Sequence, residues 1–238
     1  MIRSILPLII LISILIIPES SANGAHDPLR QSFDHKDTIR EDQILYNGKI
    51  WRNQYLNVEN DQFLFSKEFL PGSISILGKT YTGIRIKFDI YNDEIITPAD
   101  VPGIVKVNKE LVDSFSLSFQ DKTYKFINLT ADSLSGLKGY ANVLYRDRSG
   151  LYVRYFKELY QMSGQNMNID KMFYQRSQVY FVTDKTAYHI KSKRDLYRVM
   201  ESKKKQLKEF IAKNRIRVSK FEPESFIPVI KYFDSLIP

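Results

Sequence analysis

The chain has 238 residues, of which 43% are hydrophobic, with a formal net charge of +8 and no cysteine. The lack of cysteine excludes a disulfide scaffold, a thiolate metal site and a cysteine nucleophile. The hydrophobic content, together with only ten Gly and nine Pro, excludes a disordered or fibrous chain and allows one large domain or two small ones.

The N-terminus has the three parts of a secretory signal peptide: a positive charge at Arg3, an apolar run over residues 5–17 and small residues after it. We expect residues 1–22 to be this signal, cleaved after Ala22. A membrane anchor is the alternative, but a helix needs about 20 apolar residues to cross a bilayer. The mature chain is therefore expected outside the cytoplasm, with no transmembrane helix.

Residues 23–44 are polar without periodicity and are expected to form a flexible leader. Over residues 45–190, short runs of β-branched and aromatic residues alternate with turn residues, which is typical of a β-rich domain. From Ile84 to Ile90, apolar and charged residues alternate strictly, so this strand should have one buried and one exposed face. The expected strands are Gln62–Phe69, Ser73–Leu77, Tyr81–Tyr91, Ile104–Val107, Phe115–Phe119, Lys122–Leu129, Tyr140–Tyr145, Leu151–Tyr160, Val179–Val182 and Thr186–Ile190.

Four turn sequences separate these runs at hairpin spacing, at residues 77–80, 120–122, 147–150 and 183–185. Hairpins join antiparallel neighbours, so the sequence predicts a mostly antiparallel body of about 8–11 strands. A barrel, a sandwich and an open sheet all remain compatible with this pattern.

Helical periodicity begins after the last strand. Ser192 with Asp195 resembles a capping box, and a second helix is expected from Ser202 to Asn214. A third amphipathic helix contains Pro228, which is tolerated only in the first turn. We therefore expect the α+β class, with two or three helices in residues 191–238 that pack on or beside the β body.

The positive charge is concentrated in one segment. Residues 185–220 contain 13 Lys and Arg but three acids, a net charge of +10, whereas residues 23–184 are neutral. Such a segment can bind an anionic lipid, a glycolipid or an envelope protein, and the alternative is a solvated helix face. DNA is not expected, because base-reading residues are lacking. The candidate contact residues are Lys203, Lys204, Lys205, Lys208, Lys213 and Arg215.

Candidate chemistry is sparse. Asp89, Asp93, Glu94 and Asp100 form the one prominent acidic group, which suits calcium or an acid and base pair, although a strand end and turn is the simpler interpretation. His189 is expected to be an ordinary sheet residue, and no metal-binding or nucleotide-binding motif occurs. We expect no catalytic residue, metal or cofactor. A hydrolase using Asp89, Asp93 and Glu94 stays open as an alternative.

Aromatic residues gather in the final part of the predicted β body. An exposed stripe of this kind can bind carbohydrate or peptide, but at strand spacing we expect core or cross-strand packing. A cavity among these strands that holds a lipid or small molecule is another alternative. The aromatic residues are Tyr152, Tyr155, Phe156, Tyr160, Phe173, Tyr174, Tyr180 and Phe181.

Four segments resemble a functionally uncharacterised group of exported Bacteroidetes proteins, and the resemblance extends over residues 46–236. In that group a β-rich body is followed by a Lys-rich helical tail. The resemblance implies export, a Gram-negative envelope and non-catalytic status. Our leading hypothesis is an envelope protein, in the periplasm or at the periphery of the outer membrane, that binds or scaffolds; the oligomeric state stays open. The segments are Tyr46–Asn53, Asp61–Phe65, Arg85–Ile95, and Lys191–Leu196 together with Lys203–Lys205 and Lys213–Asn214.

Overall fold

The computed structural model describes residues 43–99, 103–129, 134–162 and 171–237. The expected signal peptide, nearly all of the expected leader and Asp100 lie outside the described residues. Within the described ranges, no helix combines the length and the apolar character that crossing a membrane requires.

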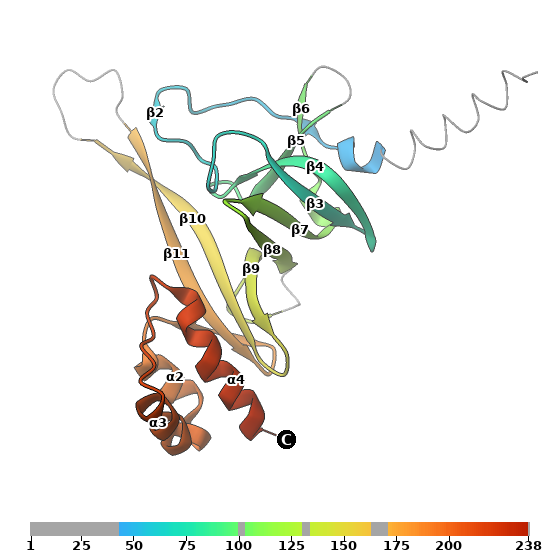
Figure 1. Ribbon diagram of the computed structural model, residues 1–238. Coiled ribbons are helices and arrows are strands. Elements are labelled where there is room, and N and C mark those ends of the chain that lie inside the picture. Colours follow the sequence, from blue (N-terminus) through green and yellow to red (C-terminus); the bar gives the residue numbers. More distant parts are fainter. Residues whose placement is uncertain (1–42, 100–102, 130–133, 163–170, 238) are drawn as a thin grey trace, which may run out of the picture. The chain divides into compact units, whose positions relative to one another are not determined.

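The described chain forms one mostly antiparallel sheet followed by helices, as Figure 1 shows, so the predicted α+β class is confirmed. The strand order is β1-β6-β5-β4-β3-β7-β8-β9-β10-β11-β12, and β2 pairs in parallel with the start of β11. The strands are β1 (Lys49–Ile50), β2 (Val58–Glu59), β3 (Leu70–Ile76), β4 (Lys79–Asp89), β5 (Glu94–Pro98), β6 (Ile104–Lys106), β7 (Val112–Phe119), β8 (Lys122–Leu129), β9 (Gly139–Arg146), β10 (Gly150–Gln161), β11 (Lys171–Thr183) and β12 (Thr186–Ile190).

The four predicted hairpins are confirmed as β3–β4, β7–β8, β9–β10 and β11–β12. One predicted strand, Gln62–Phe69, is wrong. Only Phe63 forms an isolated bridge there, with Asp89. Backbone bonds from Leu64 N to Phe88 O at 2.9 Å and from Ile90 N to Gln62 O at 3.0 Å make this bridge. Next to it, Asp61 Oδ1 accepts from Phe63 N at 2.7 Å, and Phe65 has a φ of 65°. Extended pairing therefore stops at the bridge.

The sheet curls at β4. Residues 79–86 of this strand pair with β3, whereas Lys87–Asp89 pair with β5. Gly83 lies at the register shift opposite Gly72 and Ser73 and has a φ of 70°. A glycine at positive φ is the typical extra residue of a β-bulge, which increases the local bend. The bulge lets β4 take part in two differently oriented parts of the sheet.

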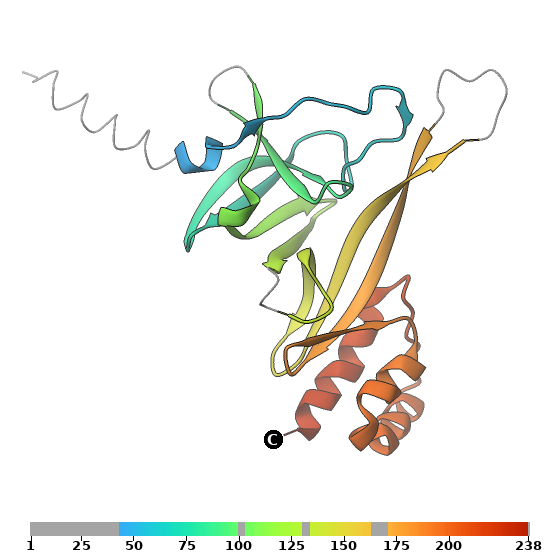
Figure 2. The same ribbon diagram turned by 180° about the vertical axis from the view of Figure 1, so that it is seen from behind.

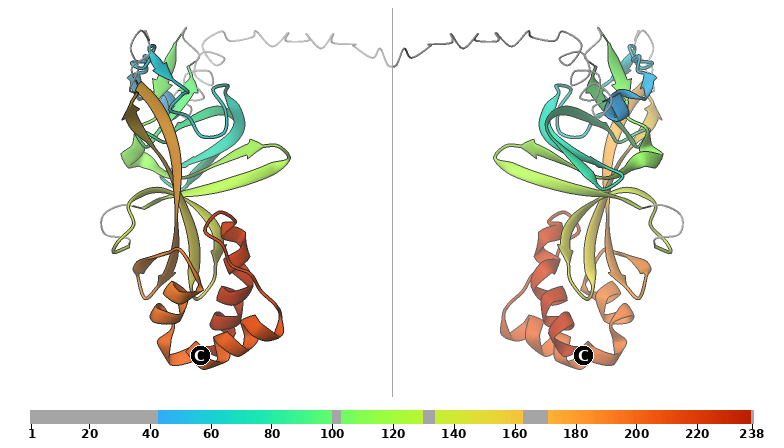
Figure 3. Two further views of the ribbon diagram at one scale, coloured as in Figure 1. Left: turned by 90° about the vertical axis from the view of Figure 1, so that its left-hand side faces the viewer. Right: turned by 90° about the vertical axis from the view of Figure 1, so that its right-hand side faces the viewer.

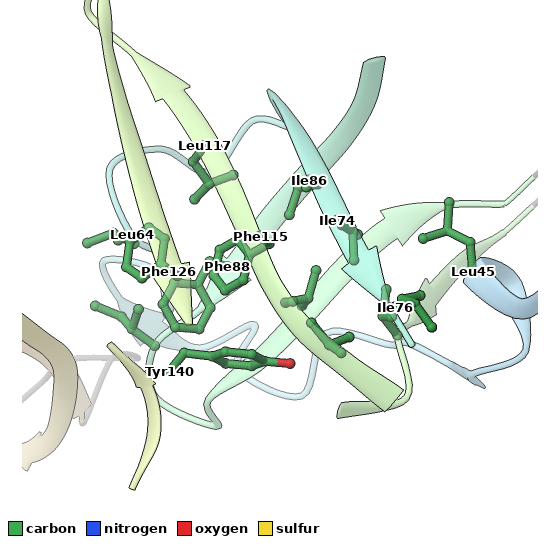
Figure 4. Packing of buried hydrophobic residues seen from close by; sticks show 14 residues of the cluster. Leu45, Leu64, Ile74, Ile76, Ile86, Phe88, Phe115, Leu117, Phe126 and Tyr140 are labelled. Carbon is green, nitrogen blue, oxygen red and sulfur yellow. The ribbon is translucent and has the colours of Figure 1, made fainter. Parts of the chain in front are cut away.

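Aromatic rings fill the interior of the curled sheet, as Figure 4 shows. Phe115 and Phe126 stack with centroids 4.6 Å apart, and Phe88 contacts both rings edge-on at 5.0 and 5.3 Å. Tyr140 closes the cluster edge-on to Phe88 at 5.6 Å. Because edge-to-face and offset pairs add to the stabilisation from burial, this cluster anchors the β body.

The helices cover one half of the long hairpin β10–β11, and Figures 2 and 3 show them at the end of the sheet near β12. Pro228 lies in the first turn of the last helix, as predicted. The second predicted helix begins later than expected, after a 3₁₀ turn. The helical elements are η1 (Lys109–Leu111), α2 (Lys193–Val199), η2 (Glu201–Lys203), α3 (Lys204–Lys213), η3 (Pro223–Phe226) and α4 (Ile227–Leu236).

The hairpin β10–β11 joins the β body to the helical layer. Leu151 and Val153 of β10 pack against the helices, while Tyr155 contacts both hydrophobic clusters. Further along β10, Lys157 N donates to Ile90 O at 3.3 Å. A single pair of strands therefore contributes to both cores.

Candidate functional site

The helical segment begins with a capped turn. Asp195 Oδ2 accepts hydrogen bonds from the backbone N–H groups of Lys191 at 3.0 Å and of Ser192 at 3.1 Å. Partial burial opposes ionisation, but these bonds and Arg198 hold the pKa of Asp195 below its ordinary value. The predicted cap is confirmed, and Asp195 is engaged within α2.

The six candidate contact residues, called here the basic cluster, surround α3. This helix buries Leu207 and Ile211 against the helical core, and its lysines lie on the opposite, solvent side. Lys203 is half-buried, and the other five side chains are exposed. Among the described residues, none of the six has its charged nitrogen within 4.0 Å of a carboxylate oxygen. The cluster, formed by Lys203, Lys204, Lys205, Lys208, Lys213 and Arg215, is therefore open to an anionic partner.

The lysines at the start of α3 work against helix stability. Lys203 is the N-cap of α3, Lys204 and Lys205 follow it, and the first turn contains no acid. A helix dipole places partial positive charge at this end, so each lysine there is unfavourable by about 0.3–1 kcal/mol at the surface. Helix stability therefore does not account for the lysines at the start of α3.

The carboxylates at the β4–β5 turn are all engaged by the fold. Asp89 is fully buried and accepts from Tyr91 N at 3.0 Å, Asn92 N at 2.9 Å and Asn92 Nδ2 at 2.9 Å. Burial raises its pKa above the ordinary value, although these hydrogen bonds oppose the change. Asp89 therefore closes the turn that the sequence suggested.

Its two neighbours hold adjacent elements. Asp93 bonds to Lys109 Nζ and accepts from Tyr140 N at 3.3 Å, and Glu94 lies 2.8 Å from Lys106 Nζ. Both ion pairs line an open groove of about 480 Å³. The described residues gather no group of three metal-ligating side chains. Asp89, Asp93 and Glu94 thus make structural contacts within the described part of the chain.

The aromatic residues of the hairpin divide between core and surface. Phe173 and Phe181 are buried, as expected, but Tyr160 and Tyr174 are 40% and 50% exposed. His189 is exposed on β12, with its ring 5.4 Å from that of Tyr180. The structure therefore places His189 on the sheet, where the sequence put it, and leaves two tyrosines on the outer part of the hairpin.

The sequence analysis did not identify two buried polar side chains, those of Asp234 and Lys157. Asp234 accepts from Tyr145 Oη at 2.9 Å and from Ser149 Oγ at 2.5 Å. Lys157 donates to the carbonyl oxygens of Asp61 and Phe63 at 2.5 and 2.8 Å. No local pattern marks either residue, because the partners lie more than 80 residues away along the chain.

The fold and this surface define an α+β protein with an unpaired basic cluster on its C-terminal helices. No protein-family model, curated protein or solved structure matches the chain.

Proposed function

We propose that the chain is an exported cell-envelope protein, periplasmic or peripheral to the outer membrane, that binds or scaffolds without catalysis. Its C-terminal helices contact an anionic partner through the basic cluster. The observation that carries this proposal is the set of mostly exposed cations around α3, none of which pairs with a carboxylate of the described residues. Membership of the Bacteroidetes group that the sequence resembles is part of the same proposal.

Two features support a surface contact. The described residues 43–184 form a body whose carboxylates at the β4–β5 turn pair with its own lysines, whereas the basic cluster has no such partners. In addition, α3 lies at the end of the helical layer away from β1–β8, in the views of Figures 1 and 3. The cluster can therefore approach a flat anionic surface without the β body intervening.

The test is binding of the chain from Asn23 onward to vesicles of anionic phosphatidylglycerol, compared with neutral phosphatidylcholine, over a range of salt. The same measurement is made on a triple variant in which Lys204, Lys205 and Lys208 are each replaced by Glu. A lysine near an anionic surface contributes about 1 kcal/mol, so this triple variant should bind on the order of 100-fold more weakly. Added salt should also weaken the binding of the parent protein to the anionic vesicles.

A matched control carries the same charge change on the β body. Lys67, Lys125 and Lys138 are exposed and form no ion pair with the described carboxylates, so their triple replacement with Glu should leave most of the binding intact. Equal loss in the two triple variants would show that net charge alone acts. Absence of binding to the anionic vesicles would exclude a lipid surface as the partner.

A further inference from the structure

The edge of β11 is covered at both ends and open in the middle. Lys171 and Met172 pair with β2, and residues 179–183 pair with β12. Between them, no described strand lies on the side of β11 away from β10. The residues of this gap from Tyr174 to Ser177 are exposed.

The backbone groups of the gap point outward. Phe173 O accepts from Asn60 Nδ2, next to β2, at 3.3 Å, so the polar groups of Phe173 face away from β10. The register between β10 and β11 continues without a shift over the whole pair. Because this direction alternates along a strand, the N–H and C=O groups of Gln175 and Ser177 also face the open side.

The charged side chain that could guard this edge is turned away from it. Arg176 Nε bonds to Glu158 Oε2 at 2.7 Å, and its Nη2 bonds to Tyr160 Oη at 2.7 Å, both on β10. Tyr174 leans the same way, since its ring lies edge-on to that of Tyr160 at 5.9 Å. Proteins usually protect exposed edges with charges or covering segments; these two side chains lie over the neighbouring strand instead.

The loop before η3 forms the other wall of a groove of about 310 Å³ along this edge. Hydrogen bonds from Phe221 N to Ser219 Oγ and from Glu222 N to Ser219 O hold the loop. It presents the ring of Phe221, which is 84% exposed, and the ammonium group of Lys220, which has no described carboxylate within 4.0 Å. The wall therefore offers one apolar and one positive contact.

We infer that the open edge of β11 is a docking site for an extended peptide segment of a partner protein. The segment adds as a strand between β2 and β12, bonding to the backbone of Gln175 and Ser177. Side chains two positions apart along an added strand lie on the same face. An apolar residue therefore meets Phe221, and an acidic residue two positions away meets Lys220, whose ammonium group lies 4.9 Å from the centroid of the Phe221 ring. This site goes beyond the proposed function, since it uses none of the basic cluster.

In the experiment, a display library of short random peptides is selected for binding to the chain from Asn23 onward. Enriched peptides should carry an apolar and an acidic residue two positions apart, and binding should protect the amides of Gln175 and Ser177 from hydrogen exchange. Ser177→Pro removes one outward N–H, which an edge strand tolerates, and should weaken binding by about tenfold or more. His189→Pro is the matched control, because the N–H of His189 also faces outward, on the side of β12 away from β11 and from the groove.

A second variant tests the site without relying on proline. Lys220→Glu should shift the selected peptides from acidic to basic sequences while leaving the fold unchanged. The inference is overturned if no peptide is enriched, if Ser177→Pro binds as the parent does, or if the same amides are protected by self-association without any peptide. In the last case a second copy of the chain is the occupant.

Discussion

The Ser149 hydroxyl donates to Oδ1 of Asp234 at 2.5 Å, and this bond joins the β9–β10 turn to the last helix. The other carboxylate oxygen of Asp234 accepts from Tyr145 Oη at 2.9 Å and from Ser149 N at 3.2 Å. Arg148 Nη1 donates to the backbone O of Asp234 at 3.1 Å. Because Asp234 and Ser149 are both buried, α4 is fixed to the sheet by polar contacts as well as by its apolar face.

Replacing Asp234 with Ala should destabilise the protein by about 2–4 kcal/mol, because the hydroxyls of buried Ser149 and half-buried Tyr145 lose the carboxylate to which they donate. Urea unfolding followed by circular dichroism measures this change. Burial and the bond to Asp234 raise the pKa of Tyr145 to about 12, so the variant should also lower that pKa. Glu209→Ala is the control, since Glu209 is exposed and forms no ion pair with a described residue. Equal losses from the two variants would contradict the assigned network.

Lys157→Met should release the segment around Phe63 from the hairpin. The Lys157 side chain is 9% exposed and its ammonium group bonds to two backbone carbonyls, which the thioether cannot replace. We expect a loss of about 1–3 kcal/mol in the free energy of unfolding, with faster hydrogen exchange at Leu64. Lys67→Met, at an exposed position, should have little effect. Unchanged exchange at Leu64 would show that packing alone holds the segment.

Local patterns predicted the fold where structure is local. β8 and β12 have the predicted bounds because each combines alternating residues with an adjacent turn. The first half of β11 was not predicted, since residues 171–178 are mostly polar and become a strand only by pairing with β10. β5 was likewise not predicted.

The candidate site divides in the same way. The distribution of charge along the sequence was enough to locate the basic cluster, because its like charges lie close together in the sequence. The lack of carboxylate partners around the cluster, the open edge at Gln175 and Ser177, and the buried carboxylate of Asp234 all depend on which distant segments pair. Such relationships have no signature in the sequence of either partner.

His189 should make stability depend on pH in mildly acidic solution. Partial burial and the charge of Lys191 lower its pKa below the ordinary value. The folded state therefore disfavours the protonated ring, so this contribution to stability is present above the unfolded pKa and is lost as pH falls through the folded pKa. As pH falls over this window, the melting temperature of the parent should fall more than that of His189→Asn, which has no group that titrates at this position. A difference that is constant with pH would contradict the assignment.

The two ends of α3 offer opposite tests of the basic cluster. Lys204 lies in the first turn and Lys213 in the last, so Lys204→Glu should stabilise the helix and Lys213→Glu should destabilise it, each by about 0.3–1 kcal/mol through the helix dipole. Both variants change the net charge equally, and both should weaken binding to anionic vesicles. Thermal unfolding and vesicle binding, measured on the same samples, separate the two effects. If binding instead followed stability, with Lys204→Glu binding more tightly, the lysines would act through the fold of the helix and not through direct contact with the anion.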